Sequence, residues 1–201
     1  MSSTDEIYER HLARAIRDIN TLGDEIGSCT RMPHPAITPV LGSGHPLADI
    51  LLIKFRPQAA EIAEGVAFFG RSGTAVLKSI RRLGIDPLAV YGTNCVKCSD
   101  GDPDAAAAAC PAWLLREIAI TEPKMLVVMG DEAVEAVNDL GVPLARALDP
   151  GRVGSVQRFT PTIEAIVVPD IDGSLNDDAS KRRFWDAFKA LGVWWDALPP
   201  W

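Results

Sequence analysis

The chain has 201 residues, of which 47% are hydrophobic and 23% charged, and its formal net charge is −7 at pH 7. This length and apolar content suffice for one well-buried domain and argue against a second. The acidic balance argues against nonspecific coating of nucleic acid, because neutralising phosphates requires a basic surface. No apolar run reaches the about 18 residues of a membrane span, and the N-terminus is charged, so we expect no membrane segment, no signal peptide and a cytoplasmic location.

The first half of the chain predicts a helix and then two strands with a helix between them. Apolar residues recur at helical spacing over about 4–23, and a turn-rich stretch follows from 27 to 46. The sequence ADILLIKF (48–55) is a continuous apolar run with the length of a buried strand. A helix over about 74–83 and a short strand, LAVYGTN (88–94), come next.

The second half continues the alternation. We expect a helix over about 104–121, a strand over 124–130 and a helix over 131–140. The stretch 153–170 supplies two extended segments, and a last helix runs from about 176 to 191. Strands that alternate with helices are typical of a parallel sheet covered by helices on its faces.

The predicted fold class is therefore a three-layer α/β/α domain with a central, largely parallel four-stranded sheet. After the N-terminal helix we expect one core over about 27–192 and an aromatic tail over 193–201. In that tail Trp194, Trp195 and Trp201 either fold back on the core or contact a partner. Ligands of such sheets bind beyond the carboxyl ends of the strands, so chemistry is expected in the loops KFRPQ, TNCVKC, MGDEA and VVPDIDGS.

Phrases near these loops resemble those of the family 4 uracil-DNA glycosylases. The phrases GVAFFGRSG, VYGTNCVKC, AAC and EPKMLVVMG match family phrases that read GRPFVGRAG, VYITNVVKC, AAC and RPKVIVALG, in the same order from about Cys29 to Leu191. The resemblance implies the α/β fold, DNA as substrate, hydrolysis of the glycosidic bond of uracil in DNA repair by base excision, and a [4Fe-4S] cluster held by four cysteines.

Two residues match the base pocket of that family. The resemblance implies that Phe68 stacks against uracil and that Asn94 reads the edge of the base. An enzyme that flips a base out of DNA needs these two residue types, since an aromatic ring supports the base and an amide offers both a donor and an acceptor. The alternatives are that Phe68 is a core residue after a turn and that Asn94 only closes its loop.

Both catalytic phrases of the family are substituted. Phe55 stands where the family phrase GEAPG has an acidic residue that places water, and Asp172 stands at the histidine of HPS that donates to the departing uracil. The histidines of the chain, His11, His34 and His45, all precede the first strand. Losing a general base or an oxyanion donor costs about 100-fold or more in rate, so ordinary uracil excision is expected to be weak.

Other carboxylates are candidates for the missing role. Glu61 falls on an acidic position of the longer first motif of the family and, like Glu64, is a candidate to position water, although solvated loop charges are the favoured interpretation. Asp172 is a candidate general base or metal ligand, or forms a turn and helix entry with Asp170. A charged Asp172 would repel a departing uracil anion, so it replaces histidine poorly.

The cysteines preserve most of a metal ligand set. By resemblance, Cys29, Cys98 and Cys110 match the first, third and fourth cluster ligands of the family, and Met32 replaces the second. Clustered cysteines in a reducing compartment are more often metal ligands or reactive thiols than disulfides.

An additional thiol, Cys95, forms a CxxC pair with Cys98. If Cys95 points into the core, it cannot also reach a metal held by Cys98. Three outcomes stay open: a [4Fe-4S] cluster completed by Cys95 or another ligand, a zinc site, or no metal and buried free thiols. His34 is a further candidate ligand, although it lies in a proline-rich loop.

The sequence as a whole favours a divergent member of the uracil-DNA glycosylase superfamily. We expect it to bind DNA or a flipped nucleobase and, if it is an enzyme, to be a hydrolase that excises a damaged, deaminated base. The alternative is a non-catalytic binding or interaction module on the same scaffold. Lys181, Arg182 and Arg183 either contact phosphate or form an ordinary polar helix face.

Overall fold

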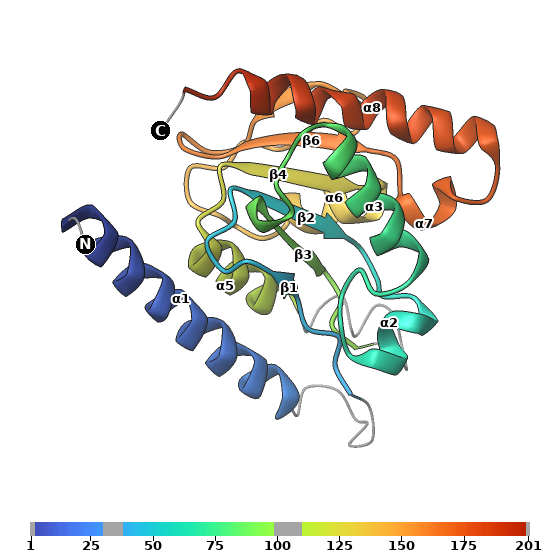
Figure 1. Cartoon of the computed structure of the whole chain (residues 1–201). Helices are drawn as coiled ribbons and strands as arrows, with labels where there is room; N and C mark the ends of the chain where they lie inside the picture. Colours follow the sequence, from blue (N-terminus) through green and yellow to red (C-terminus); the bar gives the residue numbers. More distant parts are fainter. Residues whose placement is uncertain (1–2, 30–37, 99–109, 200–201) are drawn as a thin grey trace.

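A mostly parallel sheet forms the centre of the molecule (Figure 1). The computed structural model describes residues 3–29, 38–98 and 110–199, and within them six strands lie in the order β1-β3-β2-β4-β6-β5. The strands are β1 (Ser43–Gly44), β2 (Ile50–Lys54), β3 (Val90–Asn94), β4 (Met125–Met129), β5 (Val156–Arg158) and β6 (Glu164–Val168). Strands β3, β2, β4 and β6 are parallel, and β1 and β5 pair antiparallel at the two edges.

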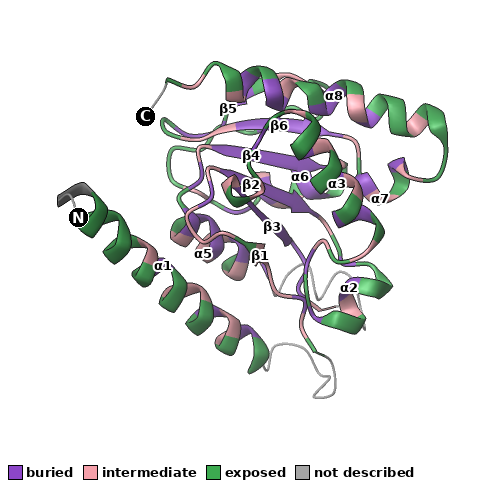
Figure 2. Ribbon diagram, in the orientation of Figure 1, coloured by how far each residue is buried: buried purple, intermediate pink, exposed green. Residues whose placement is uncertain are grey.

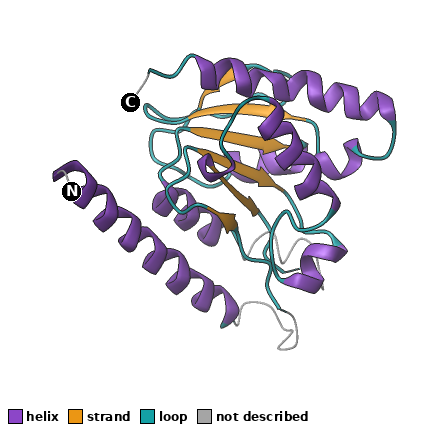
Figure 3. Ribbon diagram, viewed as in Figure 1, coloured by secondary structure: helices purple, strands orange, loops and turns teal. Residues whose placement is uncertain are grey.

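Helices cover both faces of this sheet (Figures 1 and 3). Helices α3 (Arg71–Arg82) and α8 (Asp178–Asp196) pack on one face, and α5 (Pro111–Thr121) and α6 (Asp131–Asn138) pack on the other. The middle strands are buried on both faces, which explains why they read as continuous apolar runs (Figure 2). The predicted α/β/α class with a largely parallel sheet is confirmed, and two short edge strands extend the four that were expected.

The remaining helices lie around this core. Helix α1 (Ser3–Gly27) packs beside α5. Near the C-terminal end of α1, Glu25 accepts hydrogen bonds from both terminal guanidinium nitrogens of Arg116. Short helices α2 (Ala59–Glu64), η1 (Pro87–Ala89) and α7 (Ile171–Ser174) occupy loops next to the strands. In the part of the chain that is described, no helix is both long and apolar enough to cross a membrane.

The last helix differs from the prediction at its C-terminal end. It continues to Asp196, so Trp194 and Trp195 belong to the helix and not to a tail. Trp194 packs in the core, and its indole N–H donates to Glu164 Oε2 at 2.7 Å, which confirms that this tryptophan contacts the fold. Trp201 lies outside the described residues. The helix expected from residue 104 is described only from Pro111 onward.

Helix α3 begins three residues earlier than expected, at Arg71. A Cβ atom at Gly73 would lie 1.5 Å from the backbone oxygen of Phe68, so only glycine lets this first turn approach the preceding loop. The close approach fixes that loop against the helix.

Candidate functional site

Three of the residues at the carboxyl edge of the sheet lie on one face. Lys54 and Asn94 are partners in the register of β2 and β3, so their side chains project to the same side. A Cβ atom at Gly92, two residues before Asn94, would lie 2.6 Å from Cδ2 of the Phe68 ring. The ring therefore rests on β3, on the side where Asn94 also projects, and the structure brings the two predicted base-pocket residues together with Lys54.

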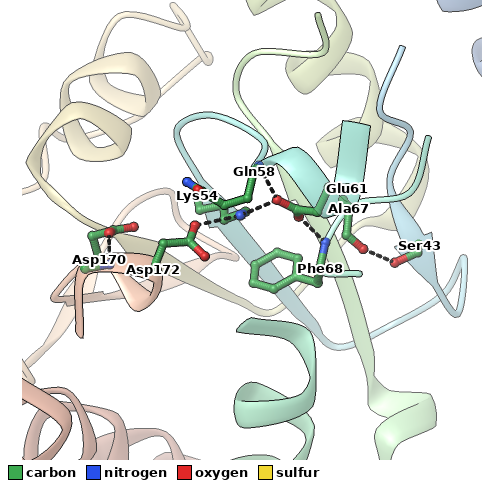
Figure 4. A network of polar contacts seen from close by, with 9 residues as sticks. Ser43, Lys54, Gln58, Glu61, Ala67, Phe68, Asp170 and Asp172 are labelled. Carbon is green, nitrogen blue, oxygen red and sulfur yellow. Dashed lines mark hydrogen bonds and ion pairs between the residues drawn. The ribbon is translucent and has the colours of Figure 1, made fainter. Parts of the chain in front are cut away.

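Lys54 is the centre of a buried charged network (Figure 4). Its side chain is 1% exposed, and its Nζ donates to Glu61 Oε2 at 2.5 Å and to Asp172 Oδ2 at 2.7 Å. The same ammonium lies 5.6 Å from the centroid of the Phe68 ring. The network therefore joins the end of β2, the base platform and the loop after β6.

Glu61 holds the loop that carries Phe68. It is fully buried, so the interpretation as a solvated loop charge is wrong for Glu61, whereas Glu64 is exposed. Glu61 Oε1 accepts the backbone N–H of Phe68, and Oε2 accepts the N–H of Gln58 at 2.7 Å besides the bond from Lys54. Phe68 itself has a φ of 58°, a left-handed conformation that costs a non-glycine residue about 1 to 3 kcal/mol. The Glu61 bonds help to hold this conformation.

Asp172 lies between the buried lysine and a surface pocket. It belongs to α7, its side chain is 19% exposed, and it lines a pocket of about 420 Å³. The other residues that line this pocket are Gln58, Ala60, Phe69, Arg71, Ser72, Asp170, Gly173, Leu175 and Asn176. Asp170 accepts the backbone N–H of Gly173 at 2.6 Å and so caps α7, as the interpretation of a helix entry required. Asp172 is therefore the carboxylate of the network that reaches solvent.

The amide of Asn94 is unsatisfied. Asn94 is fully buried, and neither its Oδ1 nor its Nδ2 has a hydrogen-bond partner among the residues that the structure describes. A buried polar group without a partner costs about 1 to 3 kcal/mol. Such an amide, next to an aromatic ring and an ammonium, has the properties of a ligand contact.

Phe55 lies outside this group. It follows Lys54 directly, so its side chain leaves on the other side of the chain, where it packs with Val96 and Cys98. The guanidinium of Arg56 lies 5.1 Å from the Phe55 ring centroid and pairs with Glu132 at 2.6 Å. The structure thus does not bring Phe55 together with Phe68 and Asn94.

The thiols divide into two environments. Burial, followed by the neighbouring Cys110 and Cys29, raises the pKa of Cys98 to about 11. Burial also raises the pKa of Cys110, whose Sγ accepts the backbone N–H of Lys97 at 3.4 Å. Cys95 packs in the core between the sheet and α5, where burial raises its pKa to about 12.

These residues do not form a complete metal site. Cys95 points into the core, which was the condition under which it could not join Cys98 as a ligand. Within the described ranges, no group of three or more histidine, cysteine, aspartate or glutamate side chains is arranged to hold a metal ion. Met32 and His34 lie outside the described residues. The described donor set does not fit a four-thiolate cluster or zinc site.

A second buried lysine lies on the other face of the sheet. Lys97 is fully buried, and its Nζ donates to Glu117 Oε2 at 2.5 Å and to the hydroxyl of Thr93. Thr93 Oγ1 donates to Glu117 at 2.9 Å, and Tyr91 OH approaches the same carboxylate at 3.5 Å. Burial, followed by the charge of Glu117, raises the pKa of Tyr91.

Sequence reasoning missed the roles of both lysines. Neither Lys54 nor Lys97 was assigned a role from the sequence. The available signal was a lysine that ends an otherwise apolar strand, ILLIK, at an edge where ligands bind. For Lys97 the signal was Glu117, a residue of opposite charge on the buried side of α5.

Together, the fold and the site define an α/β protein with a candidate ligand site at the carboxyl edge of a parallel sheet. The chain belongs to the uracil DNA glycosylase superfamily, whose family model matches residues 41–192. This confirms the superfamily that the sequence phrases indicated.

Three curated relatives are type-4 uracil-DNA glycosylases. The protein from Sulfurisphaera tokodaii is 33% identical over 103 residues, which cover 49% of this chain and 47% of the relative. Those from Pyrobaculum aerophilum and Archaeoglobus fulgidus are 26% and 25% identical over 129 and 161 residues. These matches cover 61% and 76% of this chain and 66% and 80% of the relatives. The chain thus spans about half the length of the Sulfurisphaera relative. The family 4 likeness is confirmed at modest identity.

Proposed function

We propose that this protein receives a base flipped out of DNA, stacks it on Phe68 and reads its edge with Asn94. The observation that carries this proposal is the buried amide of Asn94, which has no partner among the residues that the structure describes. One amide offers a donor and an acceptor side by side, and a nucleobase edge presents the complementary pair. A bound base would give both atoms a partner and would remove the cost of the unpaired amide.

We further propose that the protein is a glycosylase that hydrolyses the bond between a damaged base and its sugar in DNA. The relatives named as type-4 uracil-DNA glycosylases support this reaction class and DNA as the partner. Ordinary uracil excision should be slower than in an enzyme with the complete family motifs, because Phe55 carries no carboxylate and Asp172 is not a histidine. DNA contact has to be local on this acidic chain; Lys181, Arg182 and Arg183 are exposed on α8 and remain candidates for phosphate contact.

A non-catalytic binding module is the second candidate. The observation in its favour is the ion pair between Lys54 and Asp172, which occupies the carboxylate that stands at the position of the family histidine. A protein of this kind would bind a flipped base through Asn94 without cleaving the bond between the base and its sugar.

The cysteines enter this proposal as a framework and not as a metal centre. We propose that Cys29, Cys98 and Cys110 retain the positions of an iron-sulfur ligand set that Cys95 does not complete, because its side chain packs in the core. Protein purified without oxygen should be colourless and free of bound iron and zinc by elemental analysis. A brown protein with stoichiometric iron and sulfide would overturn this part of the proposal.

The experiment that tests the function uses oligonucleotides that contain uracil, hypoxanthine or xanthine, single-stranded and double-stranded. Abasic product is detected by strand cleavage in alkali, and binding is measured with an oligonucleotide that carries 2′-fluoro-2′-deoxyuridine, which resists hydrolysis. Asn94→Ala should abolish both product and base-dependent binding, whereas Asn20→Ala, at an exposed position of α1, should change neither. Binding without product would favour the non-catalytic candidate, and neither binding nor product would refute the proposal.

A further inference from the structure

We propose that the cation and the carboxylate of this site have exchanged loops relative to the family 4 uracil-DNA glycosylases. Lys54, at the end of β2, supplies the cation that contacts the departing base, and Asp172, in the loop after β6, supplies the carboxylate that holds the attacking water. By resemblance, the family has its acid on the first loop and its proton donor on the last. The inference rests on the proposed function and assigns how the same site catalyses the reaction.

The position of Lys54 fits the contact with the base. Its ammonium lies 5.6 Å from the centroid of the Phe68 ring and projects on the same face as Asn94. Within the described chain, Glu61 and Asp172 accept two of its three N–H bonds, which leaves one for an oxygen of the base.

The position of Asp172 fits the contact with water. Its Oδ2 accepts a hydrogen bond from Lys54, and Figure 4 draws no contact to the other oxygen. The side chain is 19% exposed and lines the surface pocket of about 420 Å³. Glu61 cannot fill this role, because it is fully buried and both of its oxygens are bonded to loop N–H groups and Lys54. Glu61 is a positioning residue.

The pairing removes the electrostatic objection to an aspartate at this place. A lone carboxylate would repel the negative charge that develops on the base. Here the ammonium of Lys54, 2.7 Å from Asp172 Oδ2, offsets the negative charge of the carboxylate. A fixed cation in a buried site stabilises a developing anion more than one in water, because the surroundings screen it less.

The reaction can then be written with its atoms balanced. The oxygen of water bonds to C1′ of the sugar as the bond from C1′ to the base nitrogen breaks. The bonding electrons leave with the base, whose oxygen accepts a hydrogen bond from the Lys54 ammonium. Asp172 accepts the proton lost by the water, and the base later takes a proton from solvent. The products are a free base and an abasic site.

The test compares bases that differ in acidity, since a more acidic base leaves more easily without help. Excision of uracil is compared with that of 5-fluorouracil, and of hypoxanthine with that of xanthine, in otherwise identical oligonucleotides. Lys54→Met should slow the less acidic base of each pair by about 100-fold or more and the more acidic base several-fold less. A structural role of Lys54 would slow both bases of a pair equally.

A second variant tests the water-holding role and avoids a buried charge without a partner. Asp172→Asn keeps an oxygen for Lys54, so the protein should fold, and its melting temperature is checked against the wild type. Its rate should fall by about 100-fold, equally for both bases of a pair, because it acts on the water and not on the base.

Equal losses for both bases in Lys54→Met, or unchanged rates in either variant, would overturn the exchange while leaving base excision intact. If the wild type binds the 2′-fluoro oligonucleotide through Asn94 but excises nothing, the exchange is refuted and base recognition stands. If Asn94-dependent binding is also absent, the proposed function fails first.

Discussion

Two buried lysines lie near the carboxyl ends of neighbouring strands, on opposite faces of the sheet, and their surroundings differ. Lys97 is enclosed: its partners Thr93 and Glu117 are buried and bond one another. Lys54 is enclosed on one side by Glu61, but its second partner, Asp172, reaches a pocket.

The polar groups beside the two lysines differ in the same way. On the Lys97 side, each of the named side chains has a partner within the network. On the Lys54 side, the Asn94 amide has none among the described residues. A closed network, whose groups all bond one another, stabilises the fold. An open network beside an unpaired amide gains free energy when a ligand supplies the missing hydrogen bonds. Burial of the charge alone therefore does not distinguish a structural lysine from a lysine at a ligand site. The two differ in whether a partner of the lysine contacts solvent.

The largest expected effect is on the closed network. Lys97→Met leaves Glu117 buried without its cation, so the free energy of unfolding should fall by about 3 to 5 kcal/mol. Replacing both residues, as Lys97→Met with Glu117→Leu, should recover most of this loss. Urea denaturation measures both variants. A loss below about 1 kcal/mol in the single variant would show that this network is not closed to water.

The open network should be less sensitive to the same change. In Lys54→Met, Asp172 can regain water through the pocket and only Glu61 stays buried, so we expect a loss of about 2 to 3 kcal/mol. The same denaturation series, in the same buffer, gives the comparison. If Lys54→Met destabilises the protein more than Lys97→Met, the distinction between the two networks is wrong.

The unsatisfied amide predicts a variant that gains stability and loses function. Asn94→Leu replaces the amide by an apolar side chain of similar size, so the free energy of unfolding should rise by about 1 to 2 kcal/mol. Base-dependent DNA binding should be lost. Thermal melting and the 2′-fluoro oligonucleotide measure the two properties. A destabilised Asn94→Leu protein would mean that the amide is satisfied in solution.

The smallest effect concerns the alkaline side of the pH range. Burial raises the pKa of Cys95, on the closed side of the sheet, from 9.0 to about 12. A group whose pKa is raised on folding contributes stability below the unfolded pKa and loses it as pH rises toward the folded one. The protein should therefore lose stability above about pH 9, and Cys95→Val should lose about 1 kcal/mol less per pH unit. Denaturation at pH 8 and pH 10 tests this; identical slopes would contradict it.

The sequence predicted the class of the fold because long apolar strands and amphipathic helices carry strong periodic signals. It also placed Phe68 and Asn94 in one pocket through the family phrases. The edge strand β1 was not predicted, since a pair of residues carries no measurable alternation, whereas β5 lies in the stretch 153–170 that was expected to supply two extended segments.

The charged part of the site was not predictable in the same way. Lys54 meets Asp172 across 118 positions of the chain, and no local pattern reports such a contact. Glu61 was interpreted as a solvated loop charge, but the bonds to Lys54 and to two backbone N–H groups outweigh its tendency to stay in water. The orientation of Cys95 was posed as a condition, and the strand register decided it.

The contact between Gly92 and the Phe68 ring has a consequence for the size of molecule that this site accepts. Since a Cβ atom at position 92 would lie 2.6 Å from the ring, its addition must push the ring away from β3, toward the side on which we propose that the base stacks. In this proposal, a substitution at position 92 changes the room for the base on the Phe68 ring without altering a charged group. Gly92→Ala should shift the ratio of purine to pyrimidine excision toward the smaller ring, and an unchanged ratio would show that the depth of the pocket is set elsewhere.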